Sequence, residues 1–154
     1  MCDLLKAGFY IVAPLIIMSA NWFIVTLVFY GFSIGLKYIE ADLFLIGFVA
    51  AISEFIGTSL SFFCASKLGR KRGLILTQFI AGVACFAYKI VVSTNSSDWK
   101  VALCLLFGVF GNAAAFNIIY LYTSELFPTS FRATVFGITN LIARLGGVVA
   151  PLLN

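Results

Sequence analysis

The sequence predicts an all-α, polytopic transmembrane helical bundle with about five spans, and three observations support this. Hydrophobic residues make up 62% of the 154 residues, whereas soluble domains contain about 45–50%. Charged residues make up only 10%, where about 25% is usual. The few charges separate long apolar intervals, each of which reaches the roughly 20 residues that a helix needs to cross the hydrocarbon core. A water-soluble globular domain is therefore excluded.

The apolar intervals predict the elements in order. Their runs are unbroken rather than alternating, which favours helices over the strands of a membrane barrel. The first interval, 7–36, is longer than one straight span needs, so its helix is either tilted or begins on the membrane surface before Pro14. It is also too long for a cleaved signal peptide. The expected spans cover residues 12–36, 43–66, 73–93, 101–124 and 133–154.

Basic residues near the ends of the expected spans predict the orientation. One side of the membrane receives Lys6, Lys67, Arg70, Lys71, Arg72 and Arg132, whereas the other receives Lys37, Lys89 and Lys100. Lys and Arg are enriched in cytoplasmic loops. We therefore expect the N-terminus and the tight turn Gly69–Gly73 to face the cytoplasm, with the sequon Asn95-Ser96-Ser97 on the outside.

Besides Lys89, which lies near the end of the third expected span, two charges lie deep within the expected spans. Glu54 is near the middle of the second, and Arg144 lies twelve residues after Arg132, or roughly 18 Å along a helix. A charge at the centre of a membrane helix costs about 2.5–3.5 kcal/mol on insertion scales. Such a group belongs either to a solute or coupling-ion path, or to a Glu–Arg pair or carbonyl contact that locks helices together.

Aromatic and amide side chains mark the fourth span. Phe116 and Tyr120 are spaced i and i+4 around Asn117, a pattern that fits either a face toward a cavity or ordinary packing. The sequence has no His, its four Cys show no ligand spacing, and it contains no hydrolase or nucleotide-binding motif. It also has no basic stripe for nucleic acid. We therefore expect no enzymatic activity and no metal or cofactor.

Several motifs resemble the solute carrier 22 family of organic cation and anion transporters, within the major facilitator superfamily. NAAAFNIIYLYTSELFPTSFRATVFG (Asn112–Gly137) and ARLGGVVAPL (Ala143–Leu152) resemble the family's tenth and eleventh helices. NWFIVTLVFYGFS (Asn21–Ser33) resembles the seventh helix, and SKLGRKRG (Ser66–Gly73) the turn between the eighth and ninth. The chain is thus similar to helices seven to eleven, the C-terminal half of a twelve-helix transporter, without the N-terminal half.

The resemblance implies alternating access around a solute site between two halves. In this family a cation at the position of Arg144 accompanies organic anions or zwitterions. Two departures are Thr58, where anion transporters often carry Lys, and Ser66, where the superfamily turn carries Asp. The predicted solute-binding residues are Arg144, Trp22, Phe29, Tyr30, Phe116, Asn117 and Tyr120; those predicted for structure or gating are Glu54, Gly69, Arg70, Lys71, Arg72, Glu125 and Arg132.

The predicted partners are a small organic ion, the lipid bilayer and the missing N-terminal half, and the plasma membrane is the expected location. Half of a transporter lacks the opposing wall of its cavity, so we expect that this chain does not transport alone. The alternatives are a truncated, non-transporting membrane protein, an organic cation or carnitine-type transporter, and a sugar porter. Gln78 is the only Gln, which counts against a sugar site.

Overall fold

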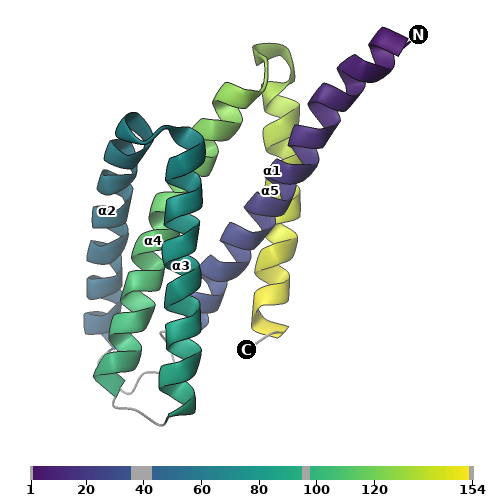
Figure 1. Cartoon of the computed structure of the whole chain (residues 1–154). Helices are drawn as coiled ribbons and strands as arrows, with labels where there is room; N and C mark the ends of the chain where they lie inside the picture. The colour runs from purple at the N-terminus through teal and green to yellow at the C-terminus, as the bar shows by residue number, and fades with distance from the viewer. Residues whose placement is uncertain (1, 36–42, 95–97, 153–154) are drawn as a thin grey trace.

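The computed structural model describes residues 2–35, 43–94 and 98–152, which form five long helices (Figure 1). These are α1 (Cys2–Gly35), α2 (Leu43–Lys67), α3 (Arg70–Ser93), α4 (Asp98–Leu126) and α5 (Thr129–Val149); the short 3-10 helix η2 (Ala150–Leu152) follows. All five long helices have the length and composition to cross a membrane. The predicted all-α, multi-span fold is confirmed.

Successive helices run in opposite directions, so the connections alternate between two ends of the bundle (Figure 1). The start of α1, the α2–α3 turn and the α4–α5 turn lie together at one end. We call this the basic end, because it holds Arg70, Lys71, Arg72 and Arg132. The end of α3, the start of α4 and η2 lie at the opposite end. This is the arrangement that the charge pattern predicts for these turns.

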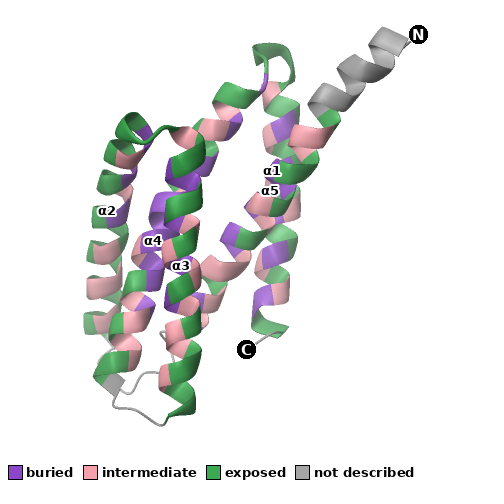
Figure 2. Cartoon of the chain, viewed as in Figure 1, coloured by how far each residue is buried: buried purple, intermediate pink, exposed green. Residues whose placement is uncertain are grey.

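Helix α4 is the most deeply buried of the five helices (Figure 2). It packs against α2, α3 and α1, while α5 packs mainly against α1. Small side chains on α4 permit this, since Ala113, Ala114 and Ala115 are almost fully buried and a methyl group at Gly108 would collide with the ring of Phe32 on α1. Small residues let helix backbones approach closely in membranes. α4 is therefore the centre of the bundle.

Two helix starts can be compared with the expectations from the sequence. α1 continues without a break through Pro14, so the residues on both sides of that proline belong to one long helix. Pro is tolerated in membrane helices because neighbouring groups satisfy the freed carbonyl. The turn predicted over Gly69–Gly73 is shorter than expected, because α3 already begins at Arg70. The cations of this segment therefore lie on the first turn of α3.

Gly69 is the residue that makes the short turn possible. Its φ is 83°, a conformation that glycine adopts far more readily than other residues. Its carbonyl accepts a hydrogen bond from the Gly73 N–H at 2.9 Å, which starts α3. Gly73 itself serves packing: it is buried, and a methyl group there would lie 3.4 Å from Cδ1 of Ile118 on α4.

Candidate functional site

A cavity of about 470 Å³ lies between α1, α4 and α5. Its size is within the range of about 300–1,000 Å³ that is typical of small-molecule sites. Five of the seven predicted solute-binding residues line it, together with five residues that were not predicted. The lining consists of Trp22, Thr26, Phe29 and Tyr30 from α1, Phe116 from α4, and Asn140, Ala143, Arg144, Gly147 and Val148 from α5.

Helical spacing explains why these side chains share one cavity. On α1, Trp22, Thr26 and Tyr30 succeed one another at intervals of four, so they form one stripe. On α5, Asn140, Arg144 and Gly147 lie four and then three residues apart and form a second stripe. α1 and α5 pack against each other, which brings the two stripes to the same place.

Two glycines allow this close approach of α1 and α5. A methyl group on Gly146 would lie 2.7 Å from the carbonyl oxygen of Phe23. One on Gly147 would lie 2.8 Å from Cε2 of Tyr30. Real Cβ atoms do not approach other atoms so closely, so larger residues would force the helices apart or displace the Tyr30 ring. The pair thus sets the distance between the Arg144 stripe and the aromatic stripe.

Trp22 anchors an aromatic cluster at one wall of the cavity. Its side chain is only 1% exposed, and its indole N–H donates a 3.1 Å hydrogen bond to Oγ1 of Thr123. Its ring meets those of Tyr120 and Phe116 edge to face, with centroids 4.4 and 5.8 Å apart. Aromatic pairs favour such edge contacts. Trp22 is therefore part of the core as well as of the lining, and it holds the more accessible rings in place.

Phe29, Tyr30 and Phe116 continue the aromatic wall. The Phe29 centroid lies 5.8 Å from that of Tyr30 and 6.3 Å from that of Phe116. Tyr30 is 47% exposed, so its ring remains available to a ligand. The wall therefore offers flat apolar surfaces opposite the α5 stripe.

Asn117 and Tyr120 border a second, neighbouring hollow of about 390 Å³. The Asn117 amide donates to the carbonyl of Ala113 at 2.9 Å and to Oγ1 of Thr58 on α2 at 3.2 Å. Tyr120 lines the second hollow only; its ring packs against Trp22, which lines the first cavity, and stacks on Phe136 at 5.9 Å. The structure thus divides the predicted solute residues between two adjacent hollows.

Arg144 is the only Lys, Arg, Asp or Glu among the residues that line the first cavity. Its side chain is exposed, and no hydrogen bond or ion pair involves it among the side chains that the structure describes. Glu54 lies exposed on α2 and makes no ion pair with Arg144 in those same residues. The Glu–Arg lock is therefore not formed, and the Arg144 guanidinium is available to an anionic group.

Thr26 and Asn140 are polar lining residues that sequence reasoning missed. The Thr26 hydroxyl is buried and has no hydrogen-bond partner, although buried polar groups are nearly always paired. The Asn140 amide nitrogen donates to the Phe136 carbonyl at 3.2 Å. Its amide oxygen accepts no hydrogen bond from the described residues. Helical spacing could have identified both residues, because Thr26 lies four residues before Tyr30 and Asn140 four before Arg144.

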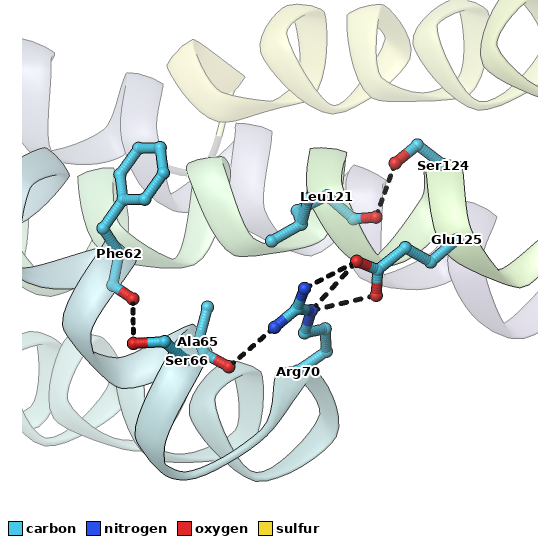
Figure 3. A network of polar contacts seen from close by, with 7 residues as sticks. All are labelled: Phe62, Ala65, Ser66, Arg70, Leu121, Ser124 and Glu125. Carbon is cyan, nitrogen blue, oxygen red and sulfur yellow. Dashed lines mark hydrogen bonds and ion pairs between the residues drawn. The ribbon is translucent and has the colours of Figure 1, made fainter.

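A separate ion pair joins helices at the basic end (Figure 3). The Arg70 guanidinium donates to both carboxylate oxygens of Glu125, with an Nη2–Oε1 distance of 2.7 Å and an Nε–Oε2 distance of 2.9 Å. Its Nη1 also donates to the Ala65 carbonyl on α2 at 3.0 Å. Two predicted gating residues thus meet, and one guanidinium ties α3 to α2 and α4.

Lys71, Arg72 and Arg132 were also predicted for structure or gating, but among the described side chains they do not join this pair. Lys71 and Arg72 are exposed on the first turn of α3. The Arg132 Nε is buried on α5 and has no partner among the described residues. Ser66 hydrogen-bonds only within α2, to the carbonyls of Phe62 and Phe63. Among the described residues, Ser66 therefore makes no cross-helix hydrogen bond of the kind expected from an Asp at its position.

The family profile and the curated relatives that match this chain point to the same protein family. The profile of the Major Facilitator Superfamily matches residues 3–151. Similar curated proteins include Solute carrier family 22 member 6-B of Xenopus laevis, 32% identical over 88% of this chain, and Solute carrier family 22 member 7 of Bos taurus, 35% identical over 85%. Organic cation/carnitine transporter 4 of Arabidopsis thaliana is 32% identical over 89% of the chain.

The chain spans about a quarter of the length of these relatives, at 24%, 24% and 26% respectively. The superfamily profile nevertheless extends over all five described helices, from residue 3 to residue 151. The match extends over nearly the whole chain and concerns membrane transporters rather than enzymes. This protein is a multi-pass membrane protein of the major facilitator superfamily, related to the solute carrier 22 organic cation and anion transporters.

Proposed function

We propose that this chain forms the solute-binding wall of an organic-ion transporter that prefers organic anions or zwitterions. The observation that carries the proposal is the free guanidinium of Arg144 opposite an aromatic wall, in one cavity of about 470 Å³. Transport by alternating access then requires a second half that closes the other side of the cavity. The plasma membrane is the proposed location.

The chemistry of the lining supports a flat solute with a carboxylate. A guanidinium presents parallel N–H donors that match the two oxygens of a carboxylate. The unpartnered hydroxyl of Thr26 supplies a further donor on the opposite stripe. Phe29, Tyr30 and Phe116 offer ring faces and edges to an aromatic solute or to the amine of a zwitterion.

The ion pair at the basic end supports a role in closing that end. Arg70 is the first residue of α3 and Glu125 lies in the last turn of α4, and their side chains are 36% and 45% exposed. An exposed pair gains little from burial and can exchange partners at low cost. We propose that Arg70, Glu125 and the neighbouring cations Lys71, Arg72 and Arg132 exchange contacts with the second half as the transporter changes state.

A matched pair of probes tests the solute preference. We expect the purified protein to bind 2-naphthoate more tightly than 2-naphthylmethylammonium, which has the same ring but the opposite charge. Arg144→Ala is expected to weaken naphthoate binding by about tenfold or more, the value of a hydrogen-bonded charged group. Arg144→Asp is expected to reverse the preference, and equilibrium dialysis with labelled probes measures both.

The control is Lys89→Ala, which removes a cation that lines a different cavity, and it should leave naphthoate binding unchanged. Unchanged naphthoate binding in both Arg144 variants, in correctly folded protein, would contradict the proposal. Uptake by cells that express this chain together with a second half, at matched surface expression, then separates two hypotheses. Uptake indicates that the chain is part of a transporter, whereas binding without uptake indicates the non-transporting product.

A further inference from the structure

A second groove, of about 610 Å³, runs between α3 and α4 and shares no lining residue with the solute cavity. Its surface is apolar except at one end, where Lys100 contributes the only charged side chain. The lining residues are Phe79, Ile80, Val83, Ala84, Ala87 and Val91 from α3, and Lys100, Leu103, Cys104 and Phe107 from α4. No step of the proposed transport uses this groove.

The length of the groove matches one leaflet of a membrane. Along α3 it extends from Phe79 to Val91, a distance of roughly 18 Å at 1.5 Å per residue. Along α4 it extends from Lys100 to Phe107, or roughly 10 Å. One leaflet contributes about half of the 30 Å hydrocarbon core. The groove therefore reaches from the end opposite the basic end to about the middle of the bilayer.

Lys100 lies near the end of its apolar span, where a lipid headgroup is expected. It is the second residue of the apolar span Trp99–Leu126, and it is exposed. Its Nζ is 5.8 Å from the centroid of the Trp99 ring. Tryptophan is enriched at membrane–water interfaces, where its ring sits at headgroup level. The cation at the mouth of the groove is thus at the depth of the phosphate layer.

The described helices leave the rest of the groove uncovered. Phe79, Val83 and Phe107 are 71%, 52% and 61% exposed, so the described parts of α1, α2 and α5 do not cover them. An apolar channel that ends in a cation is complementary in both charge and polarity to an acyl chain that ends in a phosphate.

We propose that the groove between α3 and α4 binds a glycerophospholipid, with its phosphate on Lys100 and one acyl chain along the apolar lining. This site is independent of the solute cavity. A bound lipid fills space that the helices leave open, and it contacts both α3 and α4. It is bound in the leaflet at the end of the bundle opposite the Gly69 turn.

Photocrosslinking of the purified chain in nanodiscs tests the proposal. The probe is phosphatidylglycerol with a diazirine midway along one acyl chain, at a low fraction of the total lipid. The expected labels, mapped by mass spectrometry, fall on the peptides 79–91 and 100–107. Diacylglycerol with the same diazirine chain lacks the phosphate and is expected to label these peptides about fivefold less, the effect of roughly 1 kcal/mol from one interfacial cation.

Substitutions test the contribution of the Lys100 charge and that of the apolar groove separately. Lys100→Gln is expected to reduce labelling by phosphatidylglycerol about fivefold, and Lys100→Arg to retain it. The matched control Lys89→Gln removes a cation near the same end that lines another cavity, and labelling should persist. Ala87→Phe fills the groove and should displace the label, whereas Val92→Phe, on an exposed position outside the lining, should not.

Several outcomes overturn the proposal. One is even labelling over all exposed aromatic positions, such as Phe44 and Phe48 on α2, with no effect of Lys100→Gln. Equal labelling by diacylglycerol, or stronger labelling by a diazirine fatty acid, would exclude a phosphate site. Absence of label from 79–91 and 100–107 would show that another segment covers the groove. None of these results bears on naphthoate binding at Arg144.

Discussion

Gly146 and Gly137 lie on the same helix but have opposite surroundings. A methyl group on Gly146 would lie 2.7 Å from the Phe23 carbonyl oxygen, whereas one on Gly137 would meet nothing within 4 Å. We expect Gly146→Ala to lower the free energy of unfolding by about 1–3 kcal/mol, because the α1–α5 contact is overpacked. Gly137→Ala should raise it by about 0.5–1 kcal/mol, because alanine suits a helix better than glycine does.

Thermal unfolding of the purified chain in detergent measures both substitutions. The two midpoints should move in opposite directions. If Gly146→Ala also raised the midpoint, the close packing of α1 on α5 would be wrong, and with it the placement of Arg144 near Tyr30.

The candidate site was predictable from the sequence only in part, for a geometric reason. Spacing within one helix places Trp22 and Tyr30 on the same stripe. It does not say which stripe of α5 they face, since that depends on Gly146 and Gly147 docking against α1. Asn117 was grouped with Phe116, but adjacent residues point about 100° apart around a helix. The structure accordingly directs Asn117 toward Thr58 on α2.

The ion pair between Arg70 and Glu125 links the first turn of α3 to the end of α4. We expect Glu125→Arg to lower the thermal midpoint of the chain, because it places two guanidinium groups where a carboxylate now accepts three hydrogen bonds from Nε and Nη2 of Arg70. The exchange Arg70→Glu with Glu125→Arg should recover part of the loss, since the attraction is restored. Recovery that disappears in high salt is expected, because exposed pairs are screened.

A double substitution that is as unstable as the sum of its two single substitutions would show that the pair does not couple these helices. The natural control is Arg72→Glu on the same turn of α3, which is exposed and outside the pair. Its effect should be small and should not depend on residue 125.

The helices were more predictable than the site, because lipid penalises charge directly. A charge within hydrocarbon is costly, so charge-poor intervals indicate where a chain crosses. The boundaries were less predictable, because cations at the membrane surface cost little and helices continue into them. α3 therefore begins at Arg70 rather than Gly73, and α4 extends to Leu126, past the charged Glu125.

The described residues form five long helices arranged around α4, with the candidate solute cavity beside α1 and α5 and the apolar groove between α3 and α4. The superfamily match and the alternating helix directions agree on this arrangement. It requires that the Arg70 turn and the end of α3 lie on opposite sides of the membrane. The proposed solute site depends on that requirement, and so does the assignment of the proposed lipid site to one leaflet.

The most direct test is cysteine accessibility in intact cells that express the chain, in a background with the native cysteines replaced by serine. Lys71→Cys and Thr94→Cys place one thiol at each end of α3. We predict that an impermeant maleimide labels Thr94→Cys from outside and labels Lys71→Cys only after permeabilisation. Labelling of both thiols from the same side would contradict a membrane-crossing α3 and, with it, the transporter architecture.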